Sequence, residues 1–286
     1  MTTVHIVENP NDLLTIVEPK LLESEAKHNL LLGLLARAVK EDTSLDKYLL
    51  GYVKADVHIV LAFIKTPGQK LIFSSLHESS ETMISELVHE LIQKGITIPG
   101  VIGEKHLVKK FVTQWEQEQK VTSKVDMHQF IYQLDRVNHI ELSDGEMRKA
   151  VIQDVDLITD WIYDFSFITP DPLSKEQAYI LASDSIHSET IFLWVDNDKI
   201  VSMAKKARPT KNGIVVNLVY TPREYRNRGY ASSLVATLSQ QLLDEGYKFC
   251  SLYTDASNPT SNHIYTEIGY KEIAESIVYS FCSEDS

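Results

Sequence analysis

One segment of the 286-residue chain constrains its fold most, because it joins a strand to a helix through a short turn. An apolar run ends at Tyr220, a turn containing Pro222 follows, and the pattern Arg226-x-x-Gly229-x-Ala231 then opens an amphipathic helix. The first N–H groups of a helix have no intrahelical partner, and the helix dipole places partial positive charge there. We therefore expect the N–H groups of about residues 227–232 to hold a pyrophosphate.

A plainer interpretation of the same residues is structural. Arg226 and Arg228 could form a solvated turn, and Gly229 and Ala231 could be small residues at a tight strand–helix crossing. The chain carries 28 Lys and Arg against 40 Asp and Glu, a net charge of −12. An acidic chain repels polyanions on average, so we expect no nucleic-acid partner, and any phosphate site must be local.

Composition places the chain among globular proteins and favours two domains at roughly 150 residues per domain. Hydrophobic residues make up 43% and charged residues 24%. The longest apolar runs, such as Ile59–Ile64, suit a buried strand and not a membrane span. The N-terminus shows no signal-peptide pattern. Two cysteines, Cys250 and Cys282, cannot form a zinc quartet or a disulfide framework. We expect a cytoplasmic protein without a metal site or a membrane partner.

Hydrophobic periodicity predicts mixed α/β structure in both halves, with the boundary between residues 137 and 138. In the first half we expect helices at 23–39, 82–93 and 105–118, and strands at 48–54, 58–64, 71–75, 97–102 and 126–134. In the second half we expect helices at 154–165, 175–183, 229–245 and 262–268, and strands at 190–196, 199–206, 214–220, 248–254 and 273–281. The shared order of elements suggests a duplicated fold.

Two ordered motifs resemble the GNAT superfamily of N-acetyltransferases. The first is the strand, turn and helix start Val219-Tyr220-Thr221-Pro222…Arg226-Asn227-Arg228-Gly229-Tyr230-Ala231. The second is Asn258-Pro259-Thr260-Ser261…Tyr265…Ile268-Gly269-Tyr270. The resemblance implies two GNAT-like domains of the α/β (α+β) class, each a central mixed, mostly antiparallel sheet flanked by helices. Residues 1–137 would be a degenerate copy and residues 138–286 the catalytic domain.

The resemblance also implies an acetyl-CoA site and direct transfer of the acetyl group to an amine in a ternary complex. The strand would bulge at Leu218–Tyr220 and splay from the next strand, and a backbone N–H near Val219 would stabilise the oxyanion. Tyr265 would protonate the leaving thiolate. The residues implied to bind the cofactor are Leu218, Val219, Tyr220, Thr221, Arg226, Asn227, Arg228, Gly229, Tyr230, Ala231, Ser232, Asn258 and Ser261. Alternatively, Tyr265 is a packed helix aromatic whose hydroxyl bonds to backbone.

Several alternatives stay open at the level of the sequence. The strand at 214–220 offers only Asn217 as a polar side chain before Tyr220, where many family members carry a Glu base. Asp255 is the nearest carboxylate in sequence, but a loop cap is its plainer role, so we leave the base unassigned and prefer a water relay. Trp161 and Phe165 could line the acceptor pocket, although core packing is more common for such a pair.

The first half carries Glu78 and Glu81 where a pyrophosphate would sit in a second copy, so we expect no CoA there. The runner-up function is a non-catalytic acyl-CoA-binding or sensing module, and a nucleotide-binding protein is a weaker third. The acceptor, a small-molecule amine or a protein N-terminus, and the oligomeric state are not predicted.

Overall fold

The structure is a computed structural model that describes residues 2–41, 48–77 and 81–283. Within these residues it contains eight α-helices and twelve strands, and the strand pairs are mostly antiparallel. The predicted α/β fold class with mostly antiparallel sheets is confirmed. No helix in the described ranges has both the length and the apolar character that crossing a bilayer requires.

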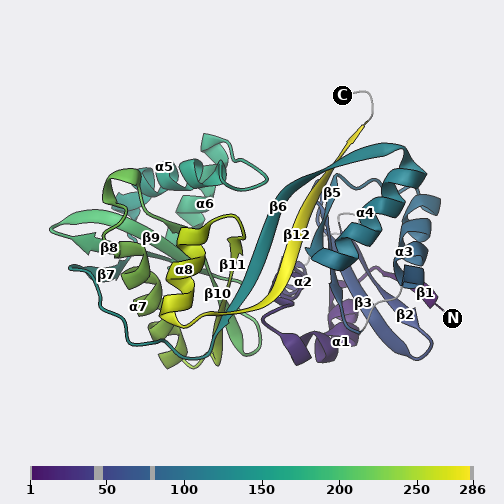
Figure 1. The fold of residues 1–286 in the computed structure, drawn as a ribbon, viewed down its shortest axis with the longest axis horizontal. Helices are drawn as coiled ribbons and strands as arrows, with labels where there is room; N and C mark the ends of the chain where they lie inside the picture. The colour runs from purple at the N-terminus through teal and green to yellow at the C-terminus, as the bar shows by residue number, and fades with distance from the viewer. Residues whose placement is uncertain (1, 42–47, 78–80, 284–286) are drawn as a thin grey trace. The chain divides into compact units, whose positions relative to one another are not determined.

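The chain divides into two compact units, shown in Figure 1. Unit 1 comprises Met1–Phe130 with Ala274–Ser286, and unit 2 comprises Ile131–Ile273. The last strand of the chain therefore lies with the first unit, whereas the sequence placed it in the second half. The assignment of residues 1–137 and 138–286 as degenerate and catalytic domains stays a prediction.

Unit 1 is a sheet with helices on both faces. Its elements are β1 (Thr2–Val7), α1 (Pro10–Leu21), α2 (Asn29–Glu41), β2 (Leu49–Ala55), β3 (His58–Lys65), β4 (Leu71–Ser75), α3 (Glu81–Gln93), β5 (Gly100–Glu104), α4 (Lys105–Gln119) and most of β6 (Val121–Leu134) and β12 (Lys271–Ser283). The strand order is β1–β2–β3–β4–β5–β12–β6. Strands β4 and β5 run parallel, and β12 pairs antiparallel with β5.

Alternation along β3 explains why unit 1 has two apolar layers. Leu61 and Phe63 pack with α3 and α4, whereas Ala62 and Ile64 pack with α1 and α2. Successive side chains of a strand point to opposite faces, so a strand covered on both sides must be apolar throughout.

Unit 2 has the same layered architecture. Its elements are β7 (Glu146–Lys149), α5 (Val155–Ser166), α6 (Lys175–His187), β8 (Ile191–Asp196), β9 (Lys199–Ala207), β10 (Gly213–Tyr220), α7 (Tyr230–Asp244), β11 (Phe249–Asp255) and α8 (Pro259–Ile268). The strand order is β11–β10–β9–β8–β7. Strands β10 and β11 run parallel, and β9 pairs antiparallel with both β10 and β8.

Two helical layers cover the sheet of unit 2 on opposite faces (Figure 1). On one face, Trp161 of α5 and Ala182 of α6 pack with Leu193 and Met203 of the sheet. On the other face lies α7, whose Ser239 carbonyl is 3.8 Å from the thiol of Cys250 on β11. The buried position of Trp161 in this cluster agrees with the core interpretation of that residue.

The structure differs from the sequence-based expectations mainly at the start of unit 1. The helix expected at 23–39 begins only at Asn29, and β1 and α1 were not predicted. The start of α1 carries ordinary signals, since Asn9 caps it and Pro10 occupies its first turn. Strand β7 was also missed, because four residues are too short a run to show periodicity.

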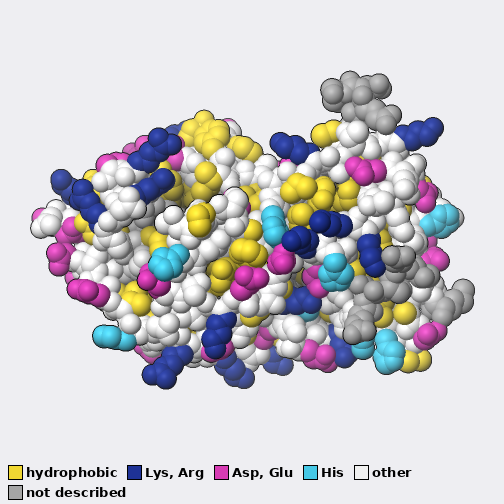
Figure 2. All heavy atoms as spheres, in the orientation of Figure 1, with side chains coloured by type: hydrophobic (Ala, Val, Ile, Leu, Met, Phe, Trp, Pro, Cys, Tyr) yellow, Lys and Arg dark blue, Asp and Glu magenta, His cyan; other side chains and the backbone are white. Residues whose placement is uncertain are grey.

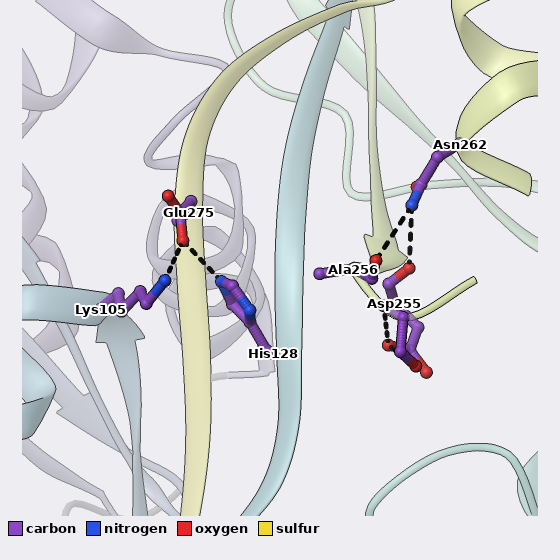
Figure 3. Close-up of polar contacts among 7 residues, drawn as sticks. Lys105, His128, Asp255, Ala256, Asn262 and Glu275 are labelled. Carbon is purple, nitrogen blue, oxygen red and sulfur yellow. Dashed lines mark hydrogen bonds and ion pairs between the residues drawn. The ribbon is translucent and has the colours of Figure 1, made fainter. Parts of the chain in front are cut away.

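Strand β12 is fastened to unit 1 by polar contacts as well as by its pairing with β5. Glu275 Oε2 accepts a hydrogen bond from Lys105 Nζ at 2.5 Å, and His128 Nε2 lies 2.6 Å from the same oxygen (Figure 3). These contacts lower the pKa of Glu275, the hydrogen bond from Lys105 contributing most.

Candidate functional site

Strand β10 contains a bulge in its pairing with β9. Asn217 pairs with Lys205 and Tyr220 pairs with Met203, so the paired register skips Leu218 and Val219. Leu218 has a φ of +49°, in the left-handed region that non-glycine residues seldom adopt. A bulge interrupts the ladder and turns the strand locally, which frees backbone groups at this point.

Strands β10 and β11 separate soon after they start. Their parallel pairing covers Gly213–Val215 against Phe249–Ser251 and does not continue beyond Val215. The second half of β10, from Asn217 to Tyr220, is half-buried, whereas the residues before it are buried. The hydrogen-bonded pairing of the two strands therefore ends before the bulge of β10.

Helix α7 follows the bulged strand β10 after a short connection. Gly229 is its N-cap with a φ of +77°, and Asn227 also has a positive φ of +60°. The first intrahelical bond runs from Ser233 N to Gly229 O, and no described side chain caps the helix start. The N–H groups of Tyr230, Ala231 and Ser232 thus have no intrahelical partner and are available to an anion.

A cavity of about 590 Å³ joins the bulge, the start of α7 and helix α8. This volume lies within the usual range of small-molecule sites. Twelve of the fourteen predicted site residues line it: Val219, Tyr220, Thr221, Arg226, Asn227, Gly229, Tyr230, Ala231, Ser232, Asn258, Ser261 and Tyr265. The structure therefore brings together residues from both sequence motifs.

Two predicted residues, Leu218 and Arg228, do not line the cavity. The side chain of Leu218 packs with the apolar cluster between the sheet and helices α5 and α6. Its left-handed backbone turns it to that face, a direction that regular strand alternation would not give. Arg228 is exposed and lies by the hydroxyl of Tyr230, which donates a 2.6 Å hydrogen bond to Asp196 Oδ2.

Arg226 lines the cavity but is also part of the turn. Its Nε donates to the carbonyl of Thr221 at 2.9 Å, which closes the turn between β10 and α7. Neither Arg226 nor Arg228 forms an ion pair within the described part of the chain. Of the two, Arg226 lines the cavity and brings a positive charge that no ion pair neutralises to the start of the helix.

Tyr265 is buried, with 8% of its surface exposed, and its ring is held by other aromatic residues. The ring centroids of Tyr270 and Tyr132 lie 5.9 and 6.4 Å away. Burial raises the pKa of Tyr265 to about 12. Within the described residues its hydroxyl has no hydrogen-bond partner, so the alternative of a backbone-bonded tyrosine is not what the structure shows.

The second motif starts with an ordered turn. Asn258 caps α8 by accepting a hydrogen bond from Ser261 N at 3.0 Å. Asp255 Oδ1 accepts from the backbone and hydroxyl of Ser257, while Asn262 bonds the carbonyls of Asp255 and Ala256 (Figure 3). Asp255 therefore serves as the loop cap that was its plainer role, and it does not line the cavity.

Four further residues line the cavity that the sequence did not single out: Ile168, Tyr225, Thr260 and Ile264. Ile264 follows Asn258 and Ser261 at helical spacing, a signal that would have identified it. Ile168 comes from the loop after α5 and is 63% exposed. Figure 2 shows hydrophobic side chains gathered over this α5–α6 region, where Phe167 and Ile180 are also exposed.

The structure also brings a carboxylate of α5 to Tyr220, one of the cavity residues. The hydroxyl of Tyr220 donates to Asp164 Oδ2 at 3.3 Å, and its ring packs on Trp161 with a centroid distance of 5.8 Å. Burial, and then the negative charge of Asp164, raise the pKa of Tyr220. Nothing in the sequence between α5 and β10 signals this pairing. Phe165 is half-buried and does not line the cavity.

The corresponding segment of unit 1 is only partly described. Glu78 lies outside the described residues, and of Glu81 only the backbone is described, as the first residue of α3. The expectation that two carboxylates repel a pyrophosphate there stays a prediction.

Comparisons with known proteins agree with this geometry. The sequence model of the acetyltransferase (GNAT) family matches residues 156–270. No protein of curated function matches the sequence. A GCN5-related N-acetyltransferase from Sphaerobacter thermophilus has a similar structure, with a TM-score of 0.64 and 14% identity over 99% of this chain and 95% of that one.

Two further solved structures are similar over nearly the whole length. A Drosophila protein has a TM-score of 0.68 at 12% identity and covers 98% of each chain. A tandem GNAT protein from the clavulanic acid biosynthesis pathway, solved without AcCoA, has a TM-score of 0.53 at 10% identity, over 99% of this chain and 98% of that one. At such identities these likenesses show the fold alone. The family match confirms the resemblance seen in the sequence for residues 156–270, which match the model of the GNAT acetyltransferase family.

Proposed function

We propose that this protein is an N-acetyltransferase that moves an acetyl group from acetyl-CoA to an amine by direct transfer in a ternary complex. One observation carries the proposal: a single cavity is lined by the start of α7, whose N–H groups lack intrahelical partners, by the bulged part of strand β10 and by Tyr265. The GNAT family match supports acyl transfer in general.

The residues at the start of α7 fit a pyrophosphate. Tyr230, Ala231 and Ser232 offer N–H groups, and Arg226 adds a formal positive charge beside them. Gly229 has no side chain to block the approach, and the four residues 226–229 are exposed. Asn258 and Ser261 face the same cavity from α8 and could contact the pantetheine arm.

When bound, acetyl-CoA supplies an acetyl group activated as a thioester. The neutral amine of the acceptor would attack the carbonyl carbon, a C–N bond would form, and the C–S bond would break. The backbone N–H of Val219, in the segment that the β10–β9 pairing skips, would stabilise the oxyanion. Tyr265 would give its proton to the departing thiolate, since its raised pKa keeps it protonated at neutral pH.

The amine must lose a proton as it attacks, and we propose that water carries it away. The hydrogen bond from Tyr220 to Asp164 offers an exit for this proton, because Tyr220 lines the cavity and Asp164 is exposed. This assignment replaces a carboxylate on the central strands: β10 has none, and Asp255 at the end of β11 caps the following loop and does not line the cavity. The cytoplasm remains our proposed compartment, supported by the two free thiols Cys250 and Cys282.

Two measurements on the full chain test the proposal. The first is release of CoA thiol from acetyl-CoA in the presence of a broad panel of amines, and the second is calorimetric binding of acetyl-CoA. We expect binding together with acceptor-dependent thiol release. Tight binding without transfer to any amine would instead support the acyl-CoA-sensing alternative. A folded protein that binds no acetyl-CoA would contradict both.

A further inference from the structure

The loop that follows helix α5 brings an apolar side chain to the cavity. Ile168 lines the cavity, and 63% of its surface is exposed. Its neighbour Phe167 is 58% exposed, and the ring of Phe167 meets the ring of Tyr163 at nearly a right angle, with a centroid distance of 5.0 Å. Exposing adjacent large apolar side chains to water at the rim of a cavity costs free energy, so this rim suits an apolar part of a ligand.

A carboxylate lies beside this part of the cavity. Tyr220 lines the same cavity as Ile168, and its hydroxyl donates to Asp164 Oδ2 at 3.3 Å. Asp164 and Ile168 are four residues apart, and Ile168 N donates to Phe165 O at 3.1 Å, so the helical turn continues as far as Ile168. Residues at this spacing lie on the same side of a helix. An apolar surface and a negative charge therefore adjoin at the α5 side of the cavity.

The charges around Tyr220 favour a cation at this side. Burial raises the pKa of Tyr220 most, and the negative charges of Asp164 and Glu224 raise it further. The positive charge of Arg226 opposes them, but a pyrophosphate at the start of α7 would neutralise that charge. The loop at 167–174 carries one charged residue, Asp171, which is also negative. This side therefore attracts an ammonium group and repels a carboxylate.

A cation of helix α6 does not alter this balance. Lys175 lies over the ring of Tyr163, with its Nζ 4.8 Å from the ring centroid. It also pairs with Asp160 of α5, so its charge is already compensated.

The other walls of the cavity are polar and belong to the proposed cofactor site. Helix α8 contributes Asn258 and Ser261, and the start of α7 contributes its unpartnered N–H groups. The thioester would lie at the bulge of β10, near Val219. The α5 side is thus the wall that the cofactor leaves for the acceptor.

We propose that the acceptor is a primary amine carried by an apolar group, without a carboxylate. Its ammonium group lies beside Tyr220 and Asp164, and its apolar group rests on Ile168 and Phe167. Each turnover converts the ammonium ion and acetyl-CoA into an N-acetylamine, the CoA thiol and one proton, which passes to water. This inference rests on the proposed acetyl transfer and names the substrate class of that site.

The first test is a series of linear primary amines, from ethylamine to octylamine, with acetyl-CoA. Burying a methylene group completely favours binding about fourfold, so we expect kcat/KM for thiol release to rise about two- to fourfold per methylene. Two compounds of similar length, 1,6-diaminohexane and 6-aminohexanoate, place a second charge on the apolar surface. Each should react at least tenfold less well than hexylamine. Equal kcat/KM values along the series would overturn the proposal even though the protein is an acetyltransferase.

Ile168 has a matched control on α6. Ile180 is 53% exposed and does not line the cavity. Ile168→Ala should reduce the preference for octylamine over ethylamine at least fivefold, whereas Ile180→Ala should keep it. Both side chains are exposed, so neither variant should fail to fold. An unchanged preference in Ile168→Ala would contradict the proposal.

A second series decides whether the apolar surface serves the amine or the acyl chain. It varies the acyl group from acetyl-CoA to octanoyl-CoA, with ethylamine as the acceptor. We expect Ile168→Ala to change selectivity in the amine series and not in the acyl series. A change in the acyl series alone would assign the surface to the acyl chain and overturn the proposal.

Binding gives a readout that does not depend on turnover. Octylamine and octanoate have the same chain length and opposite charge. Saturation-transfer NMR should detect octylamine more strongly than octanoate on the wild-type protein and on Ile180→Ala. Ile168→Ala should weaken the octylamine signal, and Asp164→Asn should remove its advantage over octanoate. If the protein transfers no acetyl group yet shows this pattern, the proposed function is wrong and the site for an apolar amine stands.

Two results of the binding experiments would overturn the site. The first is an equal signal from octylamine and octanoate on the wild-type protein. The second is a dimer in sedimentation that both Ile168→Ala and Ile180→Ala dissociate, together with no signal from octylamine. That result would assign the apolar surface to a second copy of the chain.

Discussion

Strands β4 of unit 1 and β10 of unit 2 occupy equivalent places, each antiparallel to the strand before it and parallel to the strand after its helix. Strand β4 pairs with β3 residue for residue from Ile72 to Ser75, without a bulge, and all five of its residues are buried. At its end the N–H of Ser75 donates to Glu104 Oε1 at 3.1 Å, and Glu104 also pairs with Lys27 at 2.9 Å.

Strand β10 lacks this regular pairing. Its pairing skips Leu218 and Val219, and its last four residues are half-buried. Val219 and Tyr220 among them line a cavity. In unit 1 a carboxylate accepts a hydrogen bond from the last N–H of β4, whereas β10 ends in a bulge beside a cavity. The difference teaches that the cavity of unit 2 lies where the ladder between β10 and β9 is interrupted.

The largest effect is expected from a substitution at the start of helix α7 in unit 2. In Gly229→Asp, a side chain enters at a φ of +77° and brings a negative charge to the N–H groups that would hold the pyrophosphate. We expect the Kd for acetyl-CoA to rise more than a hundredfold, measured by calorimetry.

Gly246→Asp is the matched control for this variant. Gly246 follows the other end of α7, also has a positive φ, of +106°, and has open space around it. It should suffer similar strain and keep acetyl-CoA affinity. Unchanged affinity in Gly229→Asp would contradict the helix-start site.

The next effect concerns the tyrosine hydroxyl at the cavity. Tyr265→Phe keeps the ring packing and should lower kcat about ten- to a hundredfold, while the KM for acetyl-CoA changes less than twofold. Tyr270→Phe is the comparison, because its hydroxyl bonds to Ser239 at 2.8 Å and does not line the cavity. It should cost about 1 kcal/mol of stability and leave kcat unchanged.

The pH profile checks the same role. Because burial raises the pKa of Tyr265 to about 12, the hydroxyl stays protonated through the alkaline range. The kcat of the wild-type protein should not fall between pH 8 and 10 on account of this group. A loss of kcat in that range that disappears in Tyr265→Phe would show that the tyrosine titrates lower and that its environment is more polar.

A smaller effect is expected when the contacts of Glu104 in unit 1 are removed. Glu104→Ala leaves the buried N–H of Ser75 without its acceptor and removes the ion pair with Lys27, so we expect a loss of about 2 kcal/mol in thermal or urea unfolding. Glu104→Gln keeps an acceptor oxygen and should lose less. The double variant Gly229→Asp, Glu104→Ala tests unit 1 alone, because the first substitution blocks the site of unit 2. It should bind no CoA, since β4 has no bulge. Binding of CoA by the double variant would show that the carboxylate of Glu104 alone keeps CoA out of unit 1.

The smallest effect concerns how the stability of each unit changes as the pH falls. Burial, with the charge of Lys27 adding to it, lowers the pKa of His28 in unit 1 from 6.5 to about 3. Between those values the unfolded chain binds a proton that the folded chain does not, so stability is lost as pH falls from about 6.5 to 3. The slope is at most about 1.4 kcal/mol per pH unit.

In unit 2 the loss of stability starts at a lower pH. The hydrogen bond from Arg148 lowers the pKa of Asp154 below 3.8, so its contribution is lost only below about pH 4. The melting temperature of the wild-type protein should therefore be lower at pH 5 than at pH 7. His28→Gln should reduce this difference, whereas His263→Gln, at an exposed residue of unit 2, should leave it unchanged. Equal drops in all three proteins would argue against a neutral buried His28.

Much of the site of unit 2 could be predicted because its signals are local. The turn from Tyr220 to Gly229 and the start of α8 at Asn258 are encoded in consecutive residues, and helical spacing places Ser261 and Tyr265 on one face. The bulge was implied by the family resemblance, but the direction of Leu218 depends on a backbone conformation that alternation does not reveal.

The remaining features depend on contacts between residues far apart in the chain. Glu104 reaches Ser75 across 29 positions, and Asp164 reaches Tyr220 across 56. No periodicity links such pairs, and each residue alone resembles an ordinary surface carboxylate.

The position of β12 has a consequence for how the chain is made. Unit 1 takes one of its strands from residues 274–286, which the ribosome adds only after all of unit 2. The unit that begins first is therefore completed second, and β5 must wait with one edge unpaired while residues 131–273 are synthesised. A fragment of residues 1–130 would keep that edge permanently, so a separately expressed unit 1 needs residues 274–286 joined back to it.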